Sequence, residues 1–297
     1  MKNTKPSHMA KIRKGFKFRK ILKFTLSLIC IILAVFIIWQ ATKKVPTDGD
    51  WKDTLKVLST AEFKDNLVTV KNVRNFQYDA NGNPTIEVYY DKTYDLNKLK
   101  KVWYITAPFS PDSSFAHTFL SFEFEDNSFL VITIEGRLTK GQKYSPVNGT
   151  IRTFPLMYIA TDERDAIYVR ANIFKADIYI YPLKANQKDG KLLLVDMLNR
   201  MNELSIHPAW YNSIFANCTS SIAGHVNKLW PGMLTSFDWQ VVLTSHADKM
   251  ALDSGLIDTK LTIDQARKKF YITDISQKTG YAENYSTLIR RPGMDNL

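Results

Sequence analysis

Cysteine is scarce in this chain of 297 residues, which contains only Cys30 and Cys218. Cys30 lies inside a long apolar run and Cys218 stands alone in the remainder, so no intramolecular disulfide is expected. Glycine (12) and proline (11) are also few, no stretch is of low complexity, and we find no internal repeat. This composition excludes a disulfide-stapled, collagen-like or disordered chain, and 45% hydrophobic residues suffice for a real core.

Acidic residues are missing from the start of the chain, where the first is Asp48. Residues 1–44 hold 11 of the 40 Lys and Arg residues and therefore the whole net charge of +11. Residues 45–297 contain 29 basic and 29 acidic residues. The body of the protein is neutral, so it lacks the electrostatic footprint of a nucleic-acid-binding protein, and no nucleic-acid partner is expected.

The basic segment leads directly into 19 uncharged residues, 24–42, with Trp39 near their end. As a helix rising about 1.5 Å per residue they cover about 28 Å, close to the ~30 Å hydrocarbon core of a bilayer. A cleaved signal peptide or a buried helix are the alternatives. A signal peptide would have a shorter apolar core and a small-residue cleavage site, and Gln-Ala-Thr-Lys-Lys is a poor one. We therefore expect an uncleaved anchor.

Charge asymmetry predicts the orientation of this anchor. Nine basic residues precede the apolar run and only Lys43 and Lys44 closely follow it. The N-terminus should then be cytoplasmic, the span should lie in the inner (cytoplasmic) membrane, and the rest should be periplasmic. We expect a cytoplasmic basic arm (1–23), a transmembrane anchor (24–42), a linker with an amphipathic membrane-proximal helix (43–66) and an extracytoplasmic domain (67–297).

Alternating patterns predict strands first and helices later along this domain. Strand-like runs occupy 67–73, 86–90, 99–107, 117–124, 129–135, 154–159, 166–169 and 176–181, and Asp126-Asn127 indicates a hairpin turn. Helical periodicity occupies 191–204, 218–230 and 263–270. This order predicts an α+β domain with helices packed on a mostly antiparallel sheet.

Cys218 begins the second predicted helix, with Asn217 as a candidate N-cap. The positive end of a helix dipole stabilises a thiolate, and free backbone N–H groups there can hold an oxyanion. A single cysteine is nevertheless more often a small buried hydrophobe, and this alternative stays open.

A nucleophilic cysteine needs a base, and His117 is the best placed of the five histidines. It heads the strand 117–124, and the next strand, 129–135, ends in Glu135. Antiparallel pairing through the turn would bring Glu135 beside His117, where the carboxylate could orient and stabilise the imidazole. The alternative is an exposed histidine and a solvated glutamate. His225 is about two helical turns from Cys218 and too distant along the axis to reach it.

Six sequence motifs occur in order along this domain: Val70-Lys-Asn-Val-Arg-Asn-Phe-Gln-Tyr78, Tyr90-Asp-Lys-Thr-Tyr-Asp-Leu96, Ala116-His-Thr-Phe-Leu-Ser-Phe122, Ile134-Glu-Gly-Arg137, Thr161-Asp-Glu-Arg-Asp165 and Trp210-Tyr-Asn…Ala-Asn-Cys-Thr219. Together they resemble a bacterial exported-domain family, the periplasmic N-terminal domain of Lnb-type lipoprotein N-acyltransferases. The resemblance spans roughly residues 67–245, and the His-before-Cys order is similar to circularly permuted NlpC-like, papain-like folds.

The resemblance implies roles for matching residues. Cys218 would be the nucleophile, His117 its base, Glu135 the third member, and Asn217 the residue that caps or polarises the cysteine helix. A second group also matches the family, and its members either support the site or brace the scaffold: Arg137, Asp162, Arg164, Tyr211 and Asn212. The resembled acyltransferases carry a further membrane-embedded region, and we find no later apolar run of 18 residues here.

Three functions fit these features. The first is a membrane-anchored cysteine acyltransferase that moves an acyl chain from phospholipid to an amine, such as a lipoprotein N-terminus. The second is a thiol hydrolase of cell-wall peptides, and the third is an anchored binding module without catalysis. No cofactor or metal is expected. An apolar groove beside Cys218 would favour the first function and a polar, open cleft the second.

Overall fold

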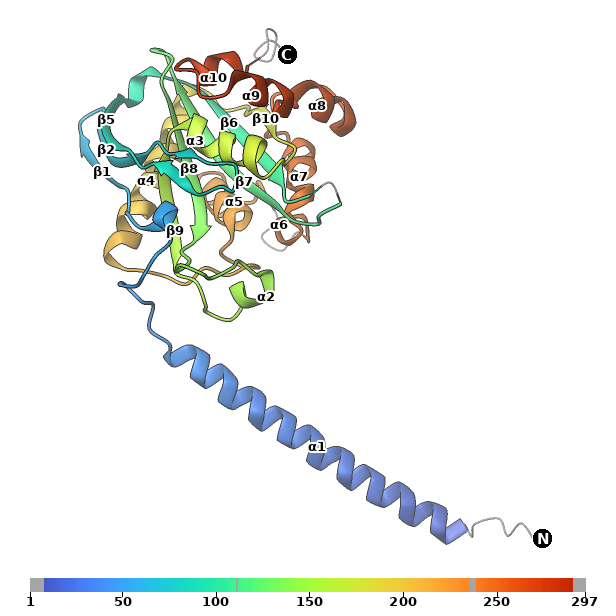
Figure 1. Cartoon of the computed structure of the whole chain (residues 1–297). Helices are drawn as coiled ribbons and strands as arrows, with labels where there is room; N and C mark the ends of the chain where they lie inside the picture. Colours follow the sequence, from blue (N-terminus) through green and yellow to red (C-terminus); the bar gives the residue numbers. More distant parts are fainter. Residues whose placement is uncertain (1–7, 111, 235–238, 291–297) are drawn as a thin grey trace. The chain divides into compact units, whose positions relative to one another are not determined.

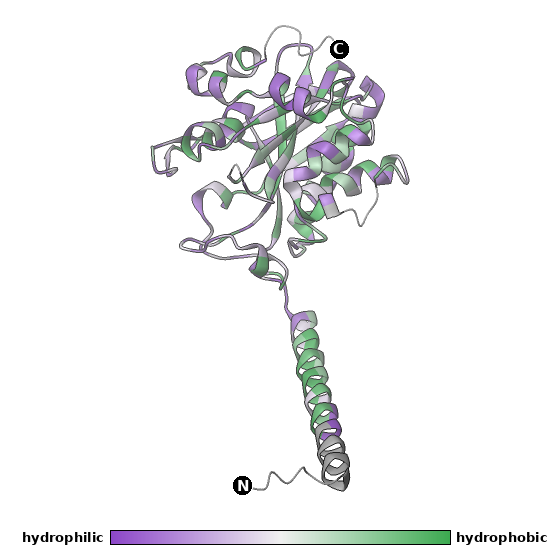
Figure 2. Cartoon of the chain, turned by 90° about the vertical axis from the view of Figure 1, so that its right-hand side faces the viewer, coloured by the Kyte–Doolittle hydropathy of each residue, from purple (hydrophilic) through white to green (hydrophobic). Residues whose placement is uncertain are grey.

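The computed structural model describes residues 8–110, 112–234 and 239–290 (Figure 1). The chain forms two compact units, Met1–Lys44 and Val45–Leu297. The first unit contains the helix α1, His8–Thr42. Within the described residues, Arg19–Thr42 is the helical segment that is long and apolar enough to cross a membrane, and the ribbon in Figure 2 is coloured as hydrophobic along most of it.

The second unit is built on one large sheet whose strand order is β1-β2-β9-β8-β7-β6-β10, with β5 also paired to β2. Its pairs are antiparallel except β2 with β9, which meet in parallel at Arg74 and Thr161. The strands are β1 Thr60–Lys64, β2 Leu67–Arg74, β5 Tyr89–Asp95, β6 Leu99–Pro108, β7 Ala116–Phe124, β8 Phe129–Gly136, β9 Leu156–Thr161 and β10 Tyr179–Pro182; β3 Gln77–Tyr78 and β4 Pro84–Ile86 pair separately.

Helices cover both faces of the sheet. On one face, α4 (Gln187–Ile206) lies against β1, β6 and β9, and α5 (Cys218–Leu229) lies against β7 and β8. On the other face α3 (Glu163–Tyr168) contacts β8, followed by a π-helical turn, Val169–Ile173. The remaining helical segments are η1 Asp53–Leu55, η2 Leu96–Lys98, α2 Pro146–Gly149, α6 Trp239–Val242, η4 Thr244–His246, α7 Ala247–Asp253, α8 Ile263–Phe270, α9 Thr273–Thr279 and α10 Tyr285–Leu288. The predicted mixed α+β class with a mostly antiparallel sheet is confirmed.

Two local predictions were wrong. Where we predicted a membrane-proximal helix in 43–66, the structure has only the 3₁₀ turn Asp53–Leu55 and the strand β1, and the compact unit already begins at Val45. Asp65, at φ 55°, turns β1 back onto β2, and aspartate tolerates this left-handed conformation. The predicted strand 166–169 lies in α3 and the following turn, because Asp162 caps the helix by accepting a hydrogen bond from the Arg164 N–H.

Candidate active site around Cys218

Cys218 is the first residue of α5, as the sequence predicted, and it is 6% exposed. Asn217 forms a capping box with Ser220: its side chain accepts from the Ser220 N–H at 2.7 Å, and its own N–H donates to Ser220 Oγ at 2.8 Å. Asn217 Nδ2 also donates to the Ser213 carbonyl at 2.7 Å. Asn217 is therefore a true N-cap that fixes the first turn of the cysteine helix.

The first turn also leaves two donors unused. The Ser220 N–H donates to Asn217 Oδ1, and the Ser221 N–H donates to the Asn217 carbonyl. No acceptor for the N–H groups of Cys218 and Thr219 is found in the described part of the chain. These two donors at the positive end of a 12-residue helix are suited to hold a negative oxygen beside the sulfur.

His117 and Glu135 meet across neighbouring strands, as predicted. The register of β7 and β8 places Phe119 opposite Thr133, and the next outward pair on the same face is His117 and Glu135. His117 Nε2 lies 3.2 Å from Glu135 Oε1 and 2.6 Å from Thr133 Oγ1. Because the Thr133 hydroxyl donates to Glu135 at 3.2 Å, its oxygen accepts from Nε2–H, and the lone pair of the imidazole then resides on Nδ1.

Cys218 lies beside the strand that carries this histidine. Its Sγ is 3.9 Å from the carbonyl oxygen of Ala116, the residue before His117. Thr244 holds that same strand end, because its hydroxyl accepts from the Ala116 N–H at 2.6 Å and donates to the Ala116 carbonyl at 2.7 Å. Cys218, His117 and Glu135 all line one cavity of about 380 Å³.

Burial keeps both reactive groups uncharged at rest. Burial lowers the pKa of His117 to about 4; Glu135 counters this shift and Arg170 adds to it. Burial raises the pKa of the Cys218 thiol, and hydrogen bonding to Thr118 and Thr219 offsets part of that rise. Burial also acts to raise the pKa of Glu135, but the positive charges around it prevail and lower it, so its carboxylate stays ionised. The resting site is a thiol, a neutral imidazole and a carboxylate.

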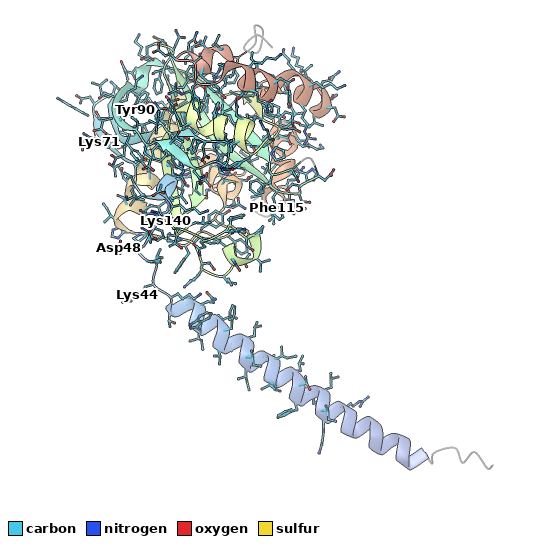
Figure 3. All side chains as sticks on the ribbon, viewed as in Figure 1. Lys44, Asp48, Lys71, Tyr90, Phe115 and Lys140 are labelled. Atoms are coloured by element: carbon cyan, nitrogen blue, oxygen red, sulfur yellow. The ribbon has the colours of Figure 1, made fainter. Side chains whose placement is uncertain are left out.

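The walls of the cavity are mainly apolar. Phe115, labelled in Figure 3, lies among them, and most of the remaining wall is aliphatic or aromatic. These residues are Ala107, Pro108, Phe109, Ile134, Leu138, Tyr144, Phe174, Ala176 and Val242. The cavity therefore offers a mainly apolar volume, lined in part by Cys218, that is suited to a hydrocarbon chain.

Of the other predicted residues, Tyr211 and Asn212 belong to the site. Tyr211 lines the cavity; burial raises its pKa, and Cys218 is among the neighbours that raise it further. Its hydroxyl lies 3.1 Å from that of Tyr144. Asn212 shapes the loop before the cysteine, since its Oδ1 accepts from the N–H groups of Ile214 and Phe215 at 2.9 and 3.0 Å.

Arg137, Asp162 and Arg164 do not reach Cys218. Arg137 donates to the carbonyls of Leu55 and Lys56 at 2.9 and 2.6 Å, so it fastens the start of the domain to the end of β8. Asp162 caps α3 and accepts from Tyr90, and Arg164 donates to the Tyr281 carbonyl. These three residues brace the scaffold.

The structure adds three residues that the sequence did not single out. Arg170 donates to Glu135 at 2.9 Å, Tyr144 lines the cavity next to Tyr211, and Thr244 clamps Ala116. No local pattern marks them, because each arrives from a segment whose position depends on the tertiary fold. Arg170 alone carried a signal that could have been used, because an ionised glutamate such as Glu135 that is withdrawn from water requires a positively charged partner.

His225 belongs to a separate buried cluster. Its Nδ1 is 2.7 Å from Asp196 and its Nε2 is 2.9 Å from the Tyr158 hydroxyl. Lys228 completes the cluster by pairing with Asp196. Within the described ranges, no group of three or more His, Cys, Asp or Glu side chains could hold a metal ion.

The fold and the site together define a mixed α+β domain in which a cluster of three residues, Cys218, His117 and Glu135, lines one mainly apolar cavity. The chain matches the family described as the Lnb N-terminal periplasmic domain over residues 86–245, more than half of its length, and it belongs to that family. This confirms the resemblance, and all three residues of the cluster lie inside the matched region. No curated protein and no solved structure matched the chain. A periplasmic domain preceded by one helix of membrane-spanning length describes a single-pass membrane protein.

Proposed function

We propose that this protein is a cysteine acyltransferase anchored in the inner membrane, with a cytoplasmic N-terminus and its catalytic domain in the periplasm. The acyl donor is a phospholipid and the acceptor an amine such as a lipoprotein N-terminus. We infer a permuted papain-like site, supported by the position of the cysteine at a helix N-terminus and of the histidine on a neighbouring strand. The observation that carries the proposal is the mainly apolar cavity that Cys218, His117 and Glu135 line together.

The first half-reaction follows from the protonation states at rest. His117 Nδ1 takes the proton of the Cys218 thiol as the sulfur attacks the ester carbonyl carbon of the lipid. The N–H groups of Cys218 and Thr219 stabilise the oxyanion, and Glu135 stabilises the imidazolium. Collapse breaks the bond to the glycerol oxygen, which receives the proton from His117. The products are a lysophospholipid and an acyl thioester on Cys218.

The second half-reaction returns the enzyme to its starting state. The acceptor amine attacks the thioester carbonyl, and His117 removes a proton from the nitrogen. The Cys218 thiolate leaves and is reprotonated by the imidazolium. The net change converts one ester into one amide without any redox step.

The character of the cavity supports this reaction over the hydrolysis of cell-wall peptides. A peptide substrate needs backbone and side-chain hydrogen-bond partners along an open cleft, whereas the cavity wall is predominantly aliphatic and aromatic. The acidic and basic side chains in its lining are those of Glu135 and Arg170, besides His117.

Intact-protein mass spectrometry after incubation with phospholipid vesicles tests the proposal. We expect a mass increase of one acyl chain on the peptide that contains Cys218, with release of lysophospholipid. Cys218→Ser and His117→Ala should abolish the adduct, whereas Cys30→Ser and His225→Ala should retain it. Free fatty acid released without any acceptor amine would indicate a hydrolase, and the absence of adduct and turnover would indicate a binding module. Either result would refute acyl transfer.

A further inference from the structure

Six exposed apolar side chains lie on segments that line the cavity: three line it themselves, and the other three are within three residues of a lining residue. They come from four segments: Phe109 after β6, Tyr144 and Val147 around α2, Phe174 after the π-helical turn, and Ile214 and Phe215 before α5. Four of them are more than half exposed: Val147 (71%), Phe215 (68%), Phe174 (64%) and Phe109 (56%). We call these six residues the apolar rim.

Ring contacts, the shared cavity lining and a backbone hydrogen bond join the segments of the rim. The rings of Phe109 and Tyr144 lie 6.4 Å apart, and both residues line the cavity together with Phe174. The loop that carries Ile214 and Phe215 is fastened to α2, because the Ser213 N–H donates to the Gly149 carbonyl at 3.1 Å. Gly149 is closely covered there, and a Cβ on it would meet Ser213 Oγ at 2.1 Å. An exposed apolar surface next to a ligand cavity marks an interaction site.

We propose that the apolar rim docks into the surface of an anionic phospholipid bilayer, so that the cavity opens directly into the lipid. The short connection between α1 and the domain indicates that the bilayer is the partner of the apolar rim. Helix α1 ends at Thr42, and the chain is hydrogen-bonded into the domain at Asp50, whose carbonyl accepts from the Lys140 N–H at 2.8 Å. The eight residue steps between them span at most about 28 Å.

This tether is short compared with the domain. A globular unit of about 250 residues has a radius of gyration of about 18 Å, and hence a diameter well above 28 Å. The tether joins the domain at Lys140, four residues from Tyr144 of the rim. In Figure 3, Lys140 and Phe115 lie at the end of the domain that carries α2, whereas Lys71 and Tyr90 lie toward the opposite end. The covalent attachment therefore keeps the rim end, rather than the far end, within reach of the membrane.

Charge supports a lipid partner over a protein one. The two longest segments that contribute to the rim, 136–161 and 204–237, contain no Asp or Glu. Lys143 and Lys175 are exposed directly beside the rim residues Tyr144 and Phe174. Apolar side chains flanked by lysines are typical of surfaces that enter the headgroup region of anionic bilayers. Docking rests on the proposed membrane attachment and not on the acyl-transfer chemistry.

Spin labels on the full chain, reconstituted into bilayers that contain anionic phospholipid, test the docking. In a background with Cys30→Ala and Cys218→Ser, single labels are placed by Val147→Cys and Phe215→Cys. The matched control is Leu67→Cys, because Leu67 is an exposed apolar residue (43%) that lines a pocket with Phe124 and Asp126, at the end of β7 opposite to Ala116 and His117. We expect the ratio of collision with oxygen to collision with a water-soluble nickel chelate to be several-fold higher at 147 and 215 than at 67.

Ratios at 147 and 215 equal to the ratio at 67 would overturn the proposal. So would protection of the rim labels from both reagents in detergent as well as in bilayers, since this would indicate a protein covering the rim. A second measurement uses Val147→Ser with Phe215→Ser in the Cys218-containing chain. Thioester formation should slow at least several-fold with vesicles but stay unchanged with a monomeric short-chain ester. If no thioester forms on wild type while the labels still lie at lipid depth, the docking proposal is supported and the acyl-transfer proposal is refuted.

Discussion

The low pKa of His117 predicts that the proposed acyl transfer is unusually tolerant of acid. The active form of the proposed general base is the neutral imidazole, so activity should be lost only as pH falls through the pKa of His117, which burial lowers to about 4. At pH 5.5 an ordinary histidine with a pKa of about 6.5 would be only about 9% neutral, but His117 would remain about 97% neutral. An ordinary base would lose about eightfold in rate between pH 7 and 5.5, whereas His117 should lose only a few per cent.

The assay is the initial rate of thioester formation on Cys218 between pH 4 and 8, followed by mass spectrometry with a monomeric short-chain ester. A monomeric substrate removes any effect of pH on lipid packing or docking. Glu135→Gln should lower the rate, because the imidazolium loses its ionised partner, without making the profile more sensitive to acid. An inflection between pH 6 and 7 in wild type would refute the assignment of His117 as a base kept neutral by burial.

The same shift has a thermodynamic consequence. The folded state holds His117 neutral down to a pKa of about 4, while the unfolded chain binds that proton near 6.5. The unfolded state therefore binds more protons between these values, and the stability that His117 contributes above pH 6.5 is lost as pH falls toward 4. Between pH 7 and 5 the loss is about 2 kcal/mol in the free energy of unfolding. His117→Gln should remove this part of the pH dependence in denaturant titrations, and equal slopes in both proteins would contradict it.

Further substitutions separate residues that take part in catalysis from those that set the pKa of His117 and those that stabilise the fold. Cys218→Ser and His117→Ala should each reduce thioester turnover by about 10²–10⁴, and the double variant should be no worse than either, because residues that act as a unit are non-additive. His225→Ala is the control; loss of activity there with retention in His117→Ala would reverse the assignment of the base. Arg170→Gln should raise the pKa of His117, so that the rate of thioester formation falls at a higher pH than in wild type. An unchanged pH dependence would show that the charge of Arg170 does not affect the pKa of His117. Arg74→Met should cost about 3–5 kcal/mol of stability in denaturant titration, because it leaves a buried carboxylate without its partner, and a loss below 1 kcal/mol would contradict that reasoning.

The core of the site could be predicted from sequence because it rests on local patterns. Alternation in β7 and β8 and the turn at Asp126-Asn127 set the hairpin register, and that register alone brings His117 and Glu135 together. The helix of Cys218 was marked by its apolar face and by Asn217 at its start. Each of these signals lies within a segment of about 20 residues.

The remainder of the site depends on contacts between distant segments. Arg170 follows a segment that we predicted as a strand and that forms helix α3, so its approach to Glu135 could not be anticipated. Tyr144 and Thr244 lie in irregular segments without periodicity and reach the cavity only through the tertiary fold. The segment 43–66 was misread because an amphipathic pattern of five apolar residues also fits a turn followed by an edge strand.

The family motif Thr161-Asp-Glu-Arg-Asp165 lies away from Cys218, yet the structure connects it to the chemistry. Asp165 is fully buried and binds Arg74 with both oxygens, at 2.9 and 3.0 Å, so it fixes α3 to β2. Glu163 accepts from Ser121 on β7 and from Arg290, which fixes the same short helix to the strand of the histidine. The π-helical turn that follows α3 carries Arg170 to Glu135. Because Glu163 and Asp165 both anchor α3, the position of Arg170 beside Glu135 is fixed. The guanidinium of Arg170 adds to the lowering of the pKa of His117, and this anchored helix positions it. The motif therefore tunes the base through the position of Arg170 rather than by any contact with the substrate.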